Sequence, residues 1–276
     1  MKKKKNLISI LIINYNNSKL AKRAIQSCIL QSYKNIEILV FDDGSTDNSV
    51  KEIRKIKKNN KIKFFENKNI NKKTKIAAFD AKNGYYFLIK KSKGNIICLL
   101  DSDDYFDKSK ISIVVDQFKK FKEVNFLQNL PNLKNNQNNS SLSFWPYLAP
   151  ESCISFRRKF IKNFMKKNYK LQNKFESVWL GFRLGTYAFF IDKSFLFHKK
   201  KLTYYSSHGE SKKYPRFGFD WFQRRIDSFE YLYLLSKKKL YFKLNHDFLV
   251  TFMIIKIFKF LKNCIWKKKL FSINRS

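Results

Sequence analysis

The chain has 276 residues, of which 44% are hydrophobic, so it is long and apolar enough to form a sizeable core and is not a disordered polymer. Its 58 Lys and Arg residues outnumber its 21 Asp and Glu residues, which gives a formal net charge of +37. This charge favours polyanionic partners such as nucleic acid, an anionic membrane or phosphate-bearing molecules, but a compositional bias toward Lys, Asn, Ile and Phe would equally produce much of it.

The cysteines favour a reducing compartment, and the N-terminus does not resemble a signal peptide. The four cysteines are scattered along the chain and form no CxxC pair: Cys28, Cys98, Cys153 and Cys264. This spacing argues against a disulfide framework and against a zinc site. The short apolar run at 7–13 has no cleavage site after it, so we expect no signal peptide. No uninterrupted apolar run reaches the ~18 residues that a membrane-spanning helix needs.

The first 120 residues alternate two kinds of pattern. Four apolar runs have the length of buried strands: 8–13, 36–41, 62–65 and 96–100. Three segments repeat apolar residues at helical spacing: 20–29, 50–56 and 111–118. Strands of this kind between amphipathic helices predict a three-layer α/β/α domain with a mostly parallel central sheet. In such sheets, ligands bind beyond the carboxyl ends of the strands.

Acidic residues follow two of the predicted strands. Residues 42–45 read Asp-Asp-Gly-Ser, and residues 101–104 read Asp-Ser-Asp-Asp. Paired carboxylates on a strand-end loop suit Mg²⁺ or Mn²⁺, which keep open positions for diphosphate oxygens. Either segment would alternatively be an acidic turn, the first one capping the following helix. The glycine-rich phosphate loops are missing, so phosphates would be handled by a metal and by cationic side chains.

Three segments together resemble the family-2 glycosyltransferases, which have the GT-A fold. Residues 9–16 resemble the opening strand of the family, residues 31–47 its second strand and loop, and residues 93–104 its metal-binding segment. The resemblance covers roughly residues 7–120. It implies transfer of a sugar from a nucleotide donor, expected to be a UDP-sugar, to an acceptor hydroxyl with inversion at the anomeric carbon. The resemblance is to the members of this family that build the bacterial cell envelope.

The resemblance also assigns roles to individual residues. Tyr15 would lie against the base of the nucleotide, and Asp43 would accept a hydrogen bond from it. Asp101 and Asp103 would hold the ribose and a Mn²⁺ or Mg²⁺ ion, with Asp103 as the more direct ligand. The metal would neutralise the departing diphosphate. Lys82 is the nearest equivalent of an Arg that relatives place near the phosphates, and a solvated lysine is the alternative.

The second half would contain the acceptor side and the catalytic base. The polar, Asn-rich segment 125–143 predicts an exposed loop. An inverting displacement needs a carboxylate that removes the proton of the acceptor hydroxyl. The family supplies it from a Glu-Asp pair, which Glu176 and Ser177 resemble except that Ser replaces Asp. Glu176 is therefore one candidate base and Asp220 its rival, while His208 would lie near the donor phosphates or the metal.

The last segment differs in composition from the rest. Residues 248–266 are mainly apolar, with Lys256, Lys259 and Lys262 at every third position. Such spacing is costly for a spanning helix and favours either a helix lying on an anionic membrane or one docked on the core. We therefore expect a nucleotide-sugar-binding half at 1–125, an acceptor-side half at 126–235 and a basic amphipathic helical tail at 236–276.

Together, these inferences predict that the protein is a metal-assisted, inverting glycosyltransferase. We expect it to act on the cytoplasmic face of the cell membrane, with a glycan or polyprenyl-linked acceptor. One alternative is a non-catalytic sugar-nucleotide-binding homologue, which Ser177 keeps open. A sugar-1-phosphate nucleotidyltransferase would need a glycine-rich loop after the first strand. A nucleic-acid-binding protein would concentrate aromatic and basic residues on one surface, whereas the aromatic residues, 17% of the chain, are spread along it, so no nucleic-acid partner is expected.

Overall fold

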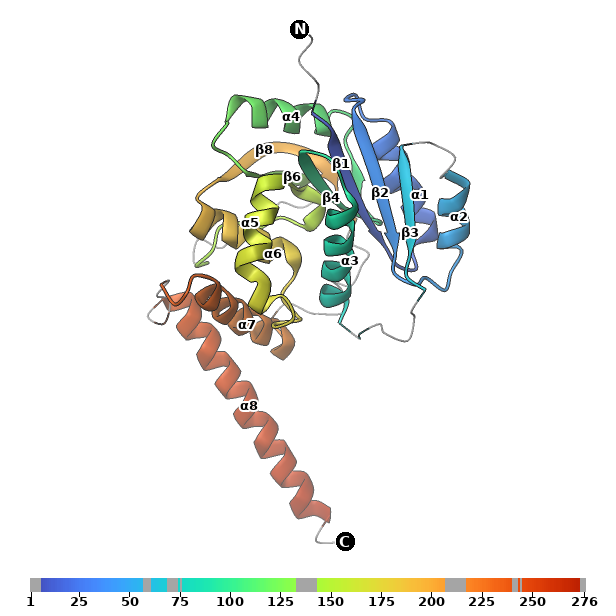
Figure 1. Ribbon diagram of the computed structural model, residues 1–276. Coiled ribbons are helices and arrows are strands. Elements are labelled where there is room, and N and C mark those ends of the chain that lie inside the picture. Colours follow the sequence, from blue (N-terminus) through green and yellow to red (C-terminus); the bar gives the residue numbers. More distant parts are fainter. Residues whose placement is uncertain are drawn as a thin grey trace.

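The computed structural model describes residues 6–56, 61–68, 74, 76–132, 143–206, 217–239, 243 and 245–273. The first half of the chain forms the parallel part of a sheet (Figure 1). Its strands, in the spatial order β3-β2-β1-β4, are β1 (Ile8–Asn14), β2 (Ile36–Asp42), β3 (Ile62–Glu66) and β4 (Ile96–Asp101). The helices of this half are α1 (Ser18–Ile29), α2 (Ser49–Ile56), α3 (Ala77–Lys91) and α4 (Lys110–Lys120). These elements confirm the four predicted strands and three predicted helices, and they add α3.

Three strands of the second half and one short strand of the first half extend the sheet, with mixed directions. In the order β7-β6-β8-β5, the added strands are β7 (Ile154–Arg157), β6 (Phe126–Asn132), β8 (Phe195–Tyr204) and β5 (Tyr105–Phe106). Strand β7 runs antiparallel to both β4 and β6, whereas β8 runs parallel to β6.

Strand β6 corrects the expectation of a loop at 125–143. Its Gln128 and Asn129 are fully buried, and their side-chain amides donate to the Tyr147 carbonyl (3.0 Å) and to Thr203 Oγ1 (3.1 Å). Buried polar side chains are tolerated when they have such partners, which a sequence pattern does not reveal. Residues 133–142 lie outside the described residues.

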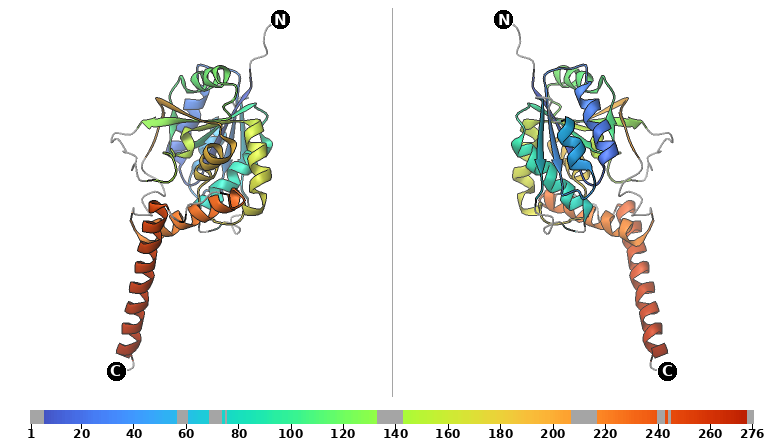
Figure 2. Two further views of the ribbon diagram at one scale, coloured as in Figure 1. Left: turned by 90° about the vertical axis from the view of Figure 1, so that its left-hand side faces the viewer. Right: turned by 90° about the vertical axis from the view of Figure 1, so that its right-hand side faces the viewer.

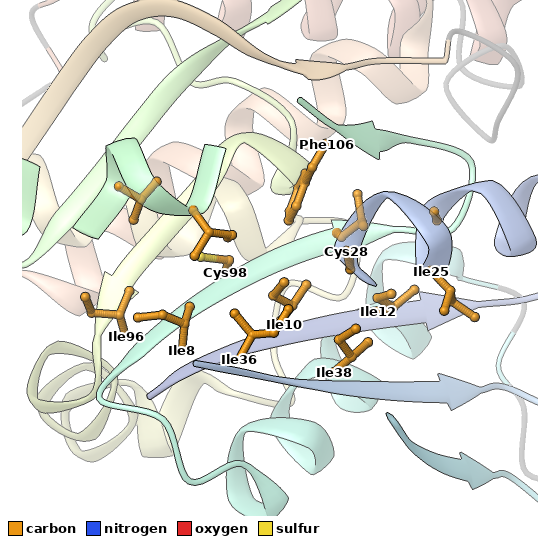
Figure 3. Packing of buried hydrophobic residues seen from close by; sticks show 14 of the residues in the cluster. Ile8, Ile10, Ile12, Ile25, Cys28, Ile36, Ile38, Ile96, Cys98 and Phe106 are labelled. Carbon is orange, nitrogen blue, oxygen red and sulfur yellow. The ribbon is translucent and has the colours of Figure 1, made fainter. Parts of the chain in front are cut away.

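Helices cover both faces of the sheet, as the three-layer prediction requires (Figures 1 and 2). One face packs Ile8, Ile10 and Ile12 of β1 against α1, α2 and α4 (Figure 3). The other face packs Leu11 and Ile13 against α3 and the second-half helices α5 (Arg158–Asn168), α6 (Leu180–Thr186) and α7 (Phe219–Leu235). Short helical turns complete this half: η2 (Glu151–Cys153), η3 (Tyr169–Leu171) and η4 (Tyr187–Asp192). Cys28, Cys98 and Cys153 are buried free thiols.

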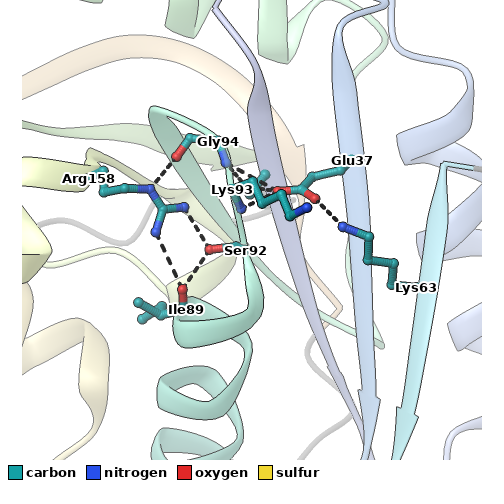
Figure 4. A network of polar contacts seen from close by, with 8 residues as sticks. Glu37, Lys63, Ile89, Ser92, Lys93, Gly94 and Arg158 are labelled. Atoms are coloured by element: carbon teal, nitrogen blue, oxygen red, sulfur yellow. Dashed lines mark hydrogen bonds and ion pairs between the residues drawn. The ribbon is translucent and has the colours of Figure 1, made fainter.

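A buried polar network anchors the strands that carry the acidic loops (Figure 4). Glu37 of β2 accepts hydrogen bonds from Ser9 Oγ (2.7 Å) and the Gly94 amide (3.2 Å), and pairs with Lys63 Nζ (2.8 Å). Arg158 Nε donates to the Gly94 carbonyl (2.6 Å). A Cβ on residue 94 would lie 2.5 Å from the Ser9 backbone nitrogen, so only glycine fits beside β1. The Gly of the metal-segment motif is therefore explained by packing.

The C-terminal helical segment is confirmed. Helix α8 (His246–Ile273) begins against α7, where Phe248 contacts Phe229 (ring centroids 5.3 Å apart) and Arg225 forms a hydrogen-bonded ion pair with Asp247. In Figures 1 and 2, α8 then projects away from the sheet. Large apolar side chains on α8 are 41% to 67% exposed: Leu249, Val250, Phe252, Met253, Ile257, Phe260 and Leu261. Within the described residues, no helix has the length and apolar character needed to cross a membrane.

Candidate active site

The loop after β2 presents the first acidic segment at the carboxyl edge of the sheet. Asp42 is buried and serves the turn itself, because it accepts from Asn14 Nδ2 (2.7 Å) and from the Ser45 amide (2.8 Å). Asp43 is also buried and accepts a hydrogen bond from Asn67 Nδ2 (2.9 Å). Tyr15 follows β1 at the same edge and is 49% exposed. The structure thus brings Tyr15 and Asp43, both predicted to bind the nucleotide, to neighbouring strand ends.

The second acidic segment begins at the last residue of β4. Asp101 Oδ1 accepts a hydrogen bond from the buried Tyr85 hydroxyl of α3 (2.7 Å). The Asp101 amide donates to Ser152 Oγ of η2 (3.0 Å). Strand register pairs Ile13 of β1 with Asp101, so this carboxylate lies at the same edge as Tyr15.

Two further carboxylates accompany Asp101 at this edge. Glu151, beside Ser152 in η2, accepts from the Gly181 amide at the start of α6 (2.8 Å). Asp104 is fully buried and accepts from the Ser206 amide (2.7 Å). The Asp101–Asp104 loop is recognisable in the sequence, whereas Glu151 is not, because no motif links η2 to a loop about fifty residues earlier.

The electrostatics of this acidic cluster, defined as Asp101, Asp103, Asp104 and Glu151, are unfavourable for negative charge. Burial, and then the charges of Glu151, Asp104 and Asp103, raise the pKa of Asp101 well above its usual value. Burial and the neighbouring Asp103 raise the pKa of Asp104 to about 7. Burial also raises the pKa of Glu151. An added cation would relieve this repulsion and favour the ionised carboxylates.

The donor set fits a hard divalent ion. Among the described residues, no three His, Cys, Asp or Glu side chains are arranged as a complete metal-binding group. Mg²⁺-type ions nevertheless use one or two carboxylates and take their other ligands from water and substrate phosphates. Asp101 and Asp103 would supply those carboxylates, and their metal role stays a prediction. His208 lies outside the described residues, two positions after Ser206.

Lys82 is not the solvated lysine that the alternative interpretation required. Its side chain is 1% exposed, and its Nζ donates to the Gln172 carbonyl and lies 4.1 Å from the centre of the Phe79 ring. Burial and, secondarily, the charge of Arg183 lower its pKa to about 8. The role of Lys82 in phosphate binding stays a prediction. In the structure, its ammonium group already donates to a backbone carbonyl.

The two candidate bases lie in different surroundings. Glu176 is exposed, on the segment that leads into α6. Asp220, in the first turn of α7, is exposed and lines a pocket of about 160 Å³ together with Ser177, Trp179 and Asp227. Asp227 was missed, because nothing in the sequence connects it to Ser177. A larger, shallow hollow of about 550 Å³ along α2 contains none of the predicted site residues.

Comparison with solved structures identifies the fold. A mannosyltransferase from Pyrobaculum calidifontis, solved with GDP-mannose and Mn²⁺, superposes with a TM-score of 0.60 at 13% identity, over 90% of this chain and 69% of that one. Residues 1–349 of S. aureus TarS, solved with UDP-GlcNAc, superpose with a TM-score of 0.57 at 15% identity, over 90% and 70% of the two chains. The GT-A-like architecture expected from the sequence is therefore confirmed.

Sequence comparison identifies the family. An uncharacterized glycosyltransferase of Rickettsia conorii is 42% identical over 121 residues, covering 44% of this chain and 18% of the relative. An Escherichia coli UDP-Glc:alpha-D-GlcNAc-diphosphoundecaprenol beta-1,3-glucosyltransferase is 39% identical over 106 residues, covering 38% of this chain and 39% of the relative. The alignments thus cover well under two thirds of these relatives. The sequence model of glycosyl transferase family 2 matches residues 9–197. Because this match spans more than half of the chain, the chain belongs to glycosyl transferase family 2.

Proposed function

We propose that the chain is an inverting glycosyltransferase that moves the sugar of a UDP-sugar to an acceptor hydroxyl, assisted by Mn²⁺ or Mg²⁺ at Asp101-Ser102-Asp103. The observation that carries the proposal is the acidic cluster at the carboxyl edge of the sheet, where burial and mutual repulsion raise the pKa of Asp101 and Asp104. Carboxylates crowded in this way favour a bound cation. The neighbour solved with UDP-GlcNAc and the relative named for UDP-Glc support a UDP-sugar as donor.

The residues of this edge would divide the work on the donor. Tyr15 offers an exposed ring against which a base can stack, and Asp43 is held by Asn67 beside it. Asp101, oriented by Tyr85, would face the ribose and the ion, and Asp103 would ligate the ion directly. When bound, the ion would neutralise charge on the departing diphosphate. A carboxylate, with Glu176 and Asp220 as the sequence-derived candidates, would accept the proton of the acceptor.

For the acceptor, we propose a glycan or polyprenyl-linked sugar at the cytoplasmic face of the membrane. The E. coli relative is named for an acceptor on diphosphoundecaprenol. Helix α8 exposes Phe252, Met253 and Phe260 together with Lys256 and Lys259, a combination suited to an anionic lipid surface. Sedimentation with anionic vesicles tests this part of the proposal, and protein that remains entirely in the supernatant would overturn it.

The donor part is tested by thermal unfolding with UDP-glucose and UDP-GlcNAc, with and without Mn²⁺. A donor at ~100-fold excess over its Kd should add about 2.7 kcal/mol to the unfolding free energy. Asp103→Ala should lose this stabilisation, whereas Asp116→Ala, an exposed acid on α4, should keep it. If Asp103→Ala retains both donor affinity and UDP release with divalent ions chelated, the proposed function is wrong.

A further inference from the structure

The pocket between α7 and the segment preceding α6 contains the Asp227 carboxylate, which no sequence motif marks. The pocket measures about 160 Å³, less than the ~300–1,000 Å³ of pockets for drug-sized ligands, so it suits a single sugar ring. Asp220, Gln223, Arg224 and Asp227 line it from one face of α7, because positions i, i+3, i+4 and i+7 of a helix share a face. Ser177 and Trp179 line it from the opposite segment. An aromatic ring facing carboxylates and an amide matches the apolar and hydroxyl-bearing surfaces of a sugar.

Asp227 is held at both of its carboxylate oxygens. Gln223 Nε2, one helical turn earlier, donates to Oδ1 (3.0 Å), and the Ser177 hydroxyl donates to Oδ2 (3.0 Å). Because its proton is directed at Asp227, Ser177 Oγ retains lone pairs that can accept a hydrogen bond from a ligand hydroxyl in the pocket. A hydroxyl bonded to an acid that a third group orients is an arrangement that activates proton transfer.

The pocket is connected to the acidic cluster through the short segment 177–181. Ser177 lies four positions before Gly181, whose amide donates to Glu151 (2.8 Å). Glu151 is the largest charged contributor to the raised pKa of Asp101. The segment that lines the pocket at Ser177 and Trp179 therefore also holds Glu151 of the acidic cluster, through the Gly181 amide.

We propose that this pocket receives the acceptor sugar and that Ser177 and Asp227 together remove its proton, an inference that rests on the proposed glycosyl transfer. The acceptor oxygen forms a bond to the anomeric carbon while the bond from that carbon to the donor phosphate breaks, and the electron pair leaves with the nucleoside diphosphate. The acceptor proton passes to Ser177 Oγ as the proton of Ser177 passes to Asp227 Oδ2. Asp227 afterwards returns its proton to water.

The other two acids are less suited to this step. Glu176 is exposed and does not line the pocket. Asp220 lines the pocket but is exposed at the first turn of α7, whereas Asp227 is partly buried and fixed by two hydrogen bonds. Since Ser177 would touch the acceptor and Asp227 acts through it, the pair takes over the work of the Asp that the family resemblance places at position 177.

Four variants test the pair: Asp227→Asn, Ser177→Ala, Ser177→Asp and the double variant Ser177→Asp/Asp227→Asn. UDP release is measured from UDP-glucose and UDP-GlcNAc, with a lipid carrying GlcNAc-diphosphate as acceptor probe and with water alone. We expect Asp227→Asn and Ser177→Ala to lower kcat at least ~100-fold, the contribution of a general base, with donor affinity unchanged. The double variant should recover turnover, because its new carboxylate at 177 takes the proton directly, and the pH profile of kcat should shift.

Asp192→Asn is the matched control, because Asp192 also accepts a hydrogen bond from a serine, Ser194, but lies outside the pocket. Asp227→Asn with wild-type kcat, or a double variant no faster than Asp227→Asn, would overturn the pair. If Asp227→Asn does not fold, full activity in Ser177→Ala would overturn it equally. A folded wild type that releases UDP from neither donor would instead overturn the proposed function, and the pair with it, so the two failures are distinguishable.

Discussion

Replacing Tyr85 by Phe tests whether Asp101 belongs to the site that binds donor and cation. The Tyr85 hydroxyl donates to Asp101 Oδ1 at 2.7 Å, while its ring is buried in the core and would be matched by Phe. This hydrogen bond lowers the pKa of Asp101, against burial and the charges of Glu151, Asp104 and Asp103, which raise it. Without the hydroxyl, the carboxylate is both less ionised and less oriented. Removing the partner of a metal-binding side chain typically costs about 10- to 100-fold in metal affinity, or ~1.4–2.7 kcal/mol.

The assay is a Mn²⁺ titration in the presence of a fixed excess of UDP-glucose or UDP-GlcNAc, followed by thermal unfolding. Tyr86→Phe is the matched control, because Tyr86 is its neighbour on α3 and its hydroxyl accepts instead from Asn168 Nδ2 (3.2 Å). We expect the Mn²⁺ concentration at half-effect to rise at least ~10-fold for Tyr85→Phe. It should stay within about twofold of wild type for Tyr86→Phe. Equal titrations for Tyr85→Phe and wild type would refute the assignment of Asp101 to the cation site.

Packing, membrane binding and a buried lysine give three more tests. Gly94→Ala places a Cβ 2.5 Å from the Ser9 nitrogen and should cost about 1–3 kcal/mol of unfolding free energy in urea, and an unchanged midpoint would contradict that contact. Lys256→Glu with Lys259→Glu should weaken binding to anionic vesicles by about 30-fold or more, at ~1 kcal/mol per lysine, and undiminished binding would exclude α8 as the contact. Burial lowers the pKa of Lys110 from 10.5 to about 8, so the unfolded chain holds more protons in that range. Wild-type stability should therefore rise from pH 8 to 10 relative to Lys110→Met, and parallel pH profiles would count against the buried charge.

The parts of the fold that could be predicted are those whose pattern is local. Ile8, Ile10 and Ile12 alternate with Leu11 and Ile13 toward two helical layers, and a continuous apolar run is what a strand buried on both faces requires. Strand β6 could not be predicted in this way, because the side-chain amides of Gln128 and Asn129 donate to distant partners in the 143–150 segment and in β8. The local sequence pattern does not reveal such long-range hydrogen bonds.

The residues of the candidate and proposed sites also differ in whether a local sequence pattern could predict their positions. Asp43, Asp101 and Asp103 could be located because each lies at or just after the end of a strand, and parallel strands end at one edge of a sheet. Asp227 could not, since it lies 50 positions after Ser177 and becomes relevant only when α7 packs over the segment before α6. The burial of Lys82 could not be predicted either, because the sequence does not distinguish a buried lysine from an exposed one in a helix with several lysines.

Part of the chain's positive charge is buried and has a structural role, which the composition alone does not reveal. Arg183 is fully buried and donates to the carbonyls of Leu171 (3.1 Å) and Val178 (3.0 Å), which bracket the segment carrying Glu176 and Ser177. Lys110 is likewise buried, and it binds the Ser152 carbonyl and Thr203 Oγ1 (2.8 Å) behind the acidic cluster. Both cations are thus bound to neutral oxygens of the loops and strands that shape the site. The charge of Lys110 offsets only part of the repulsion, because burial and the charge of Asp103 still raise the pKa of Asp104 to about 7, and the proposed divalent ion would relieve what remains.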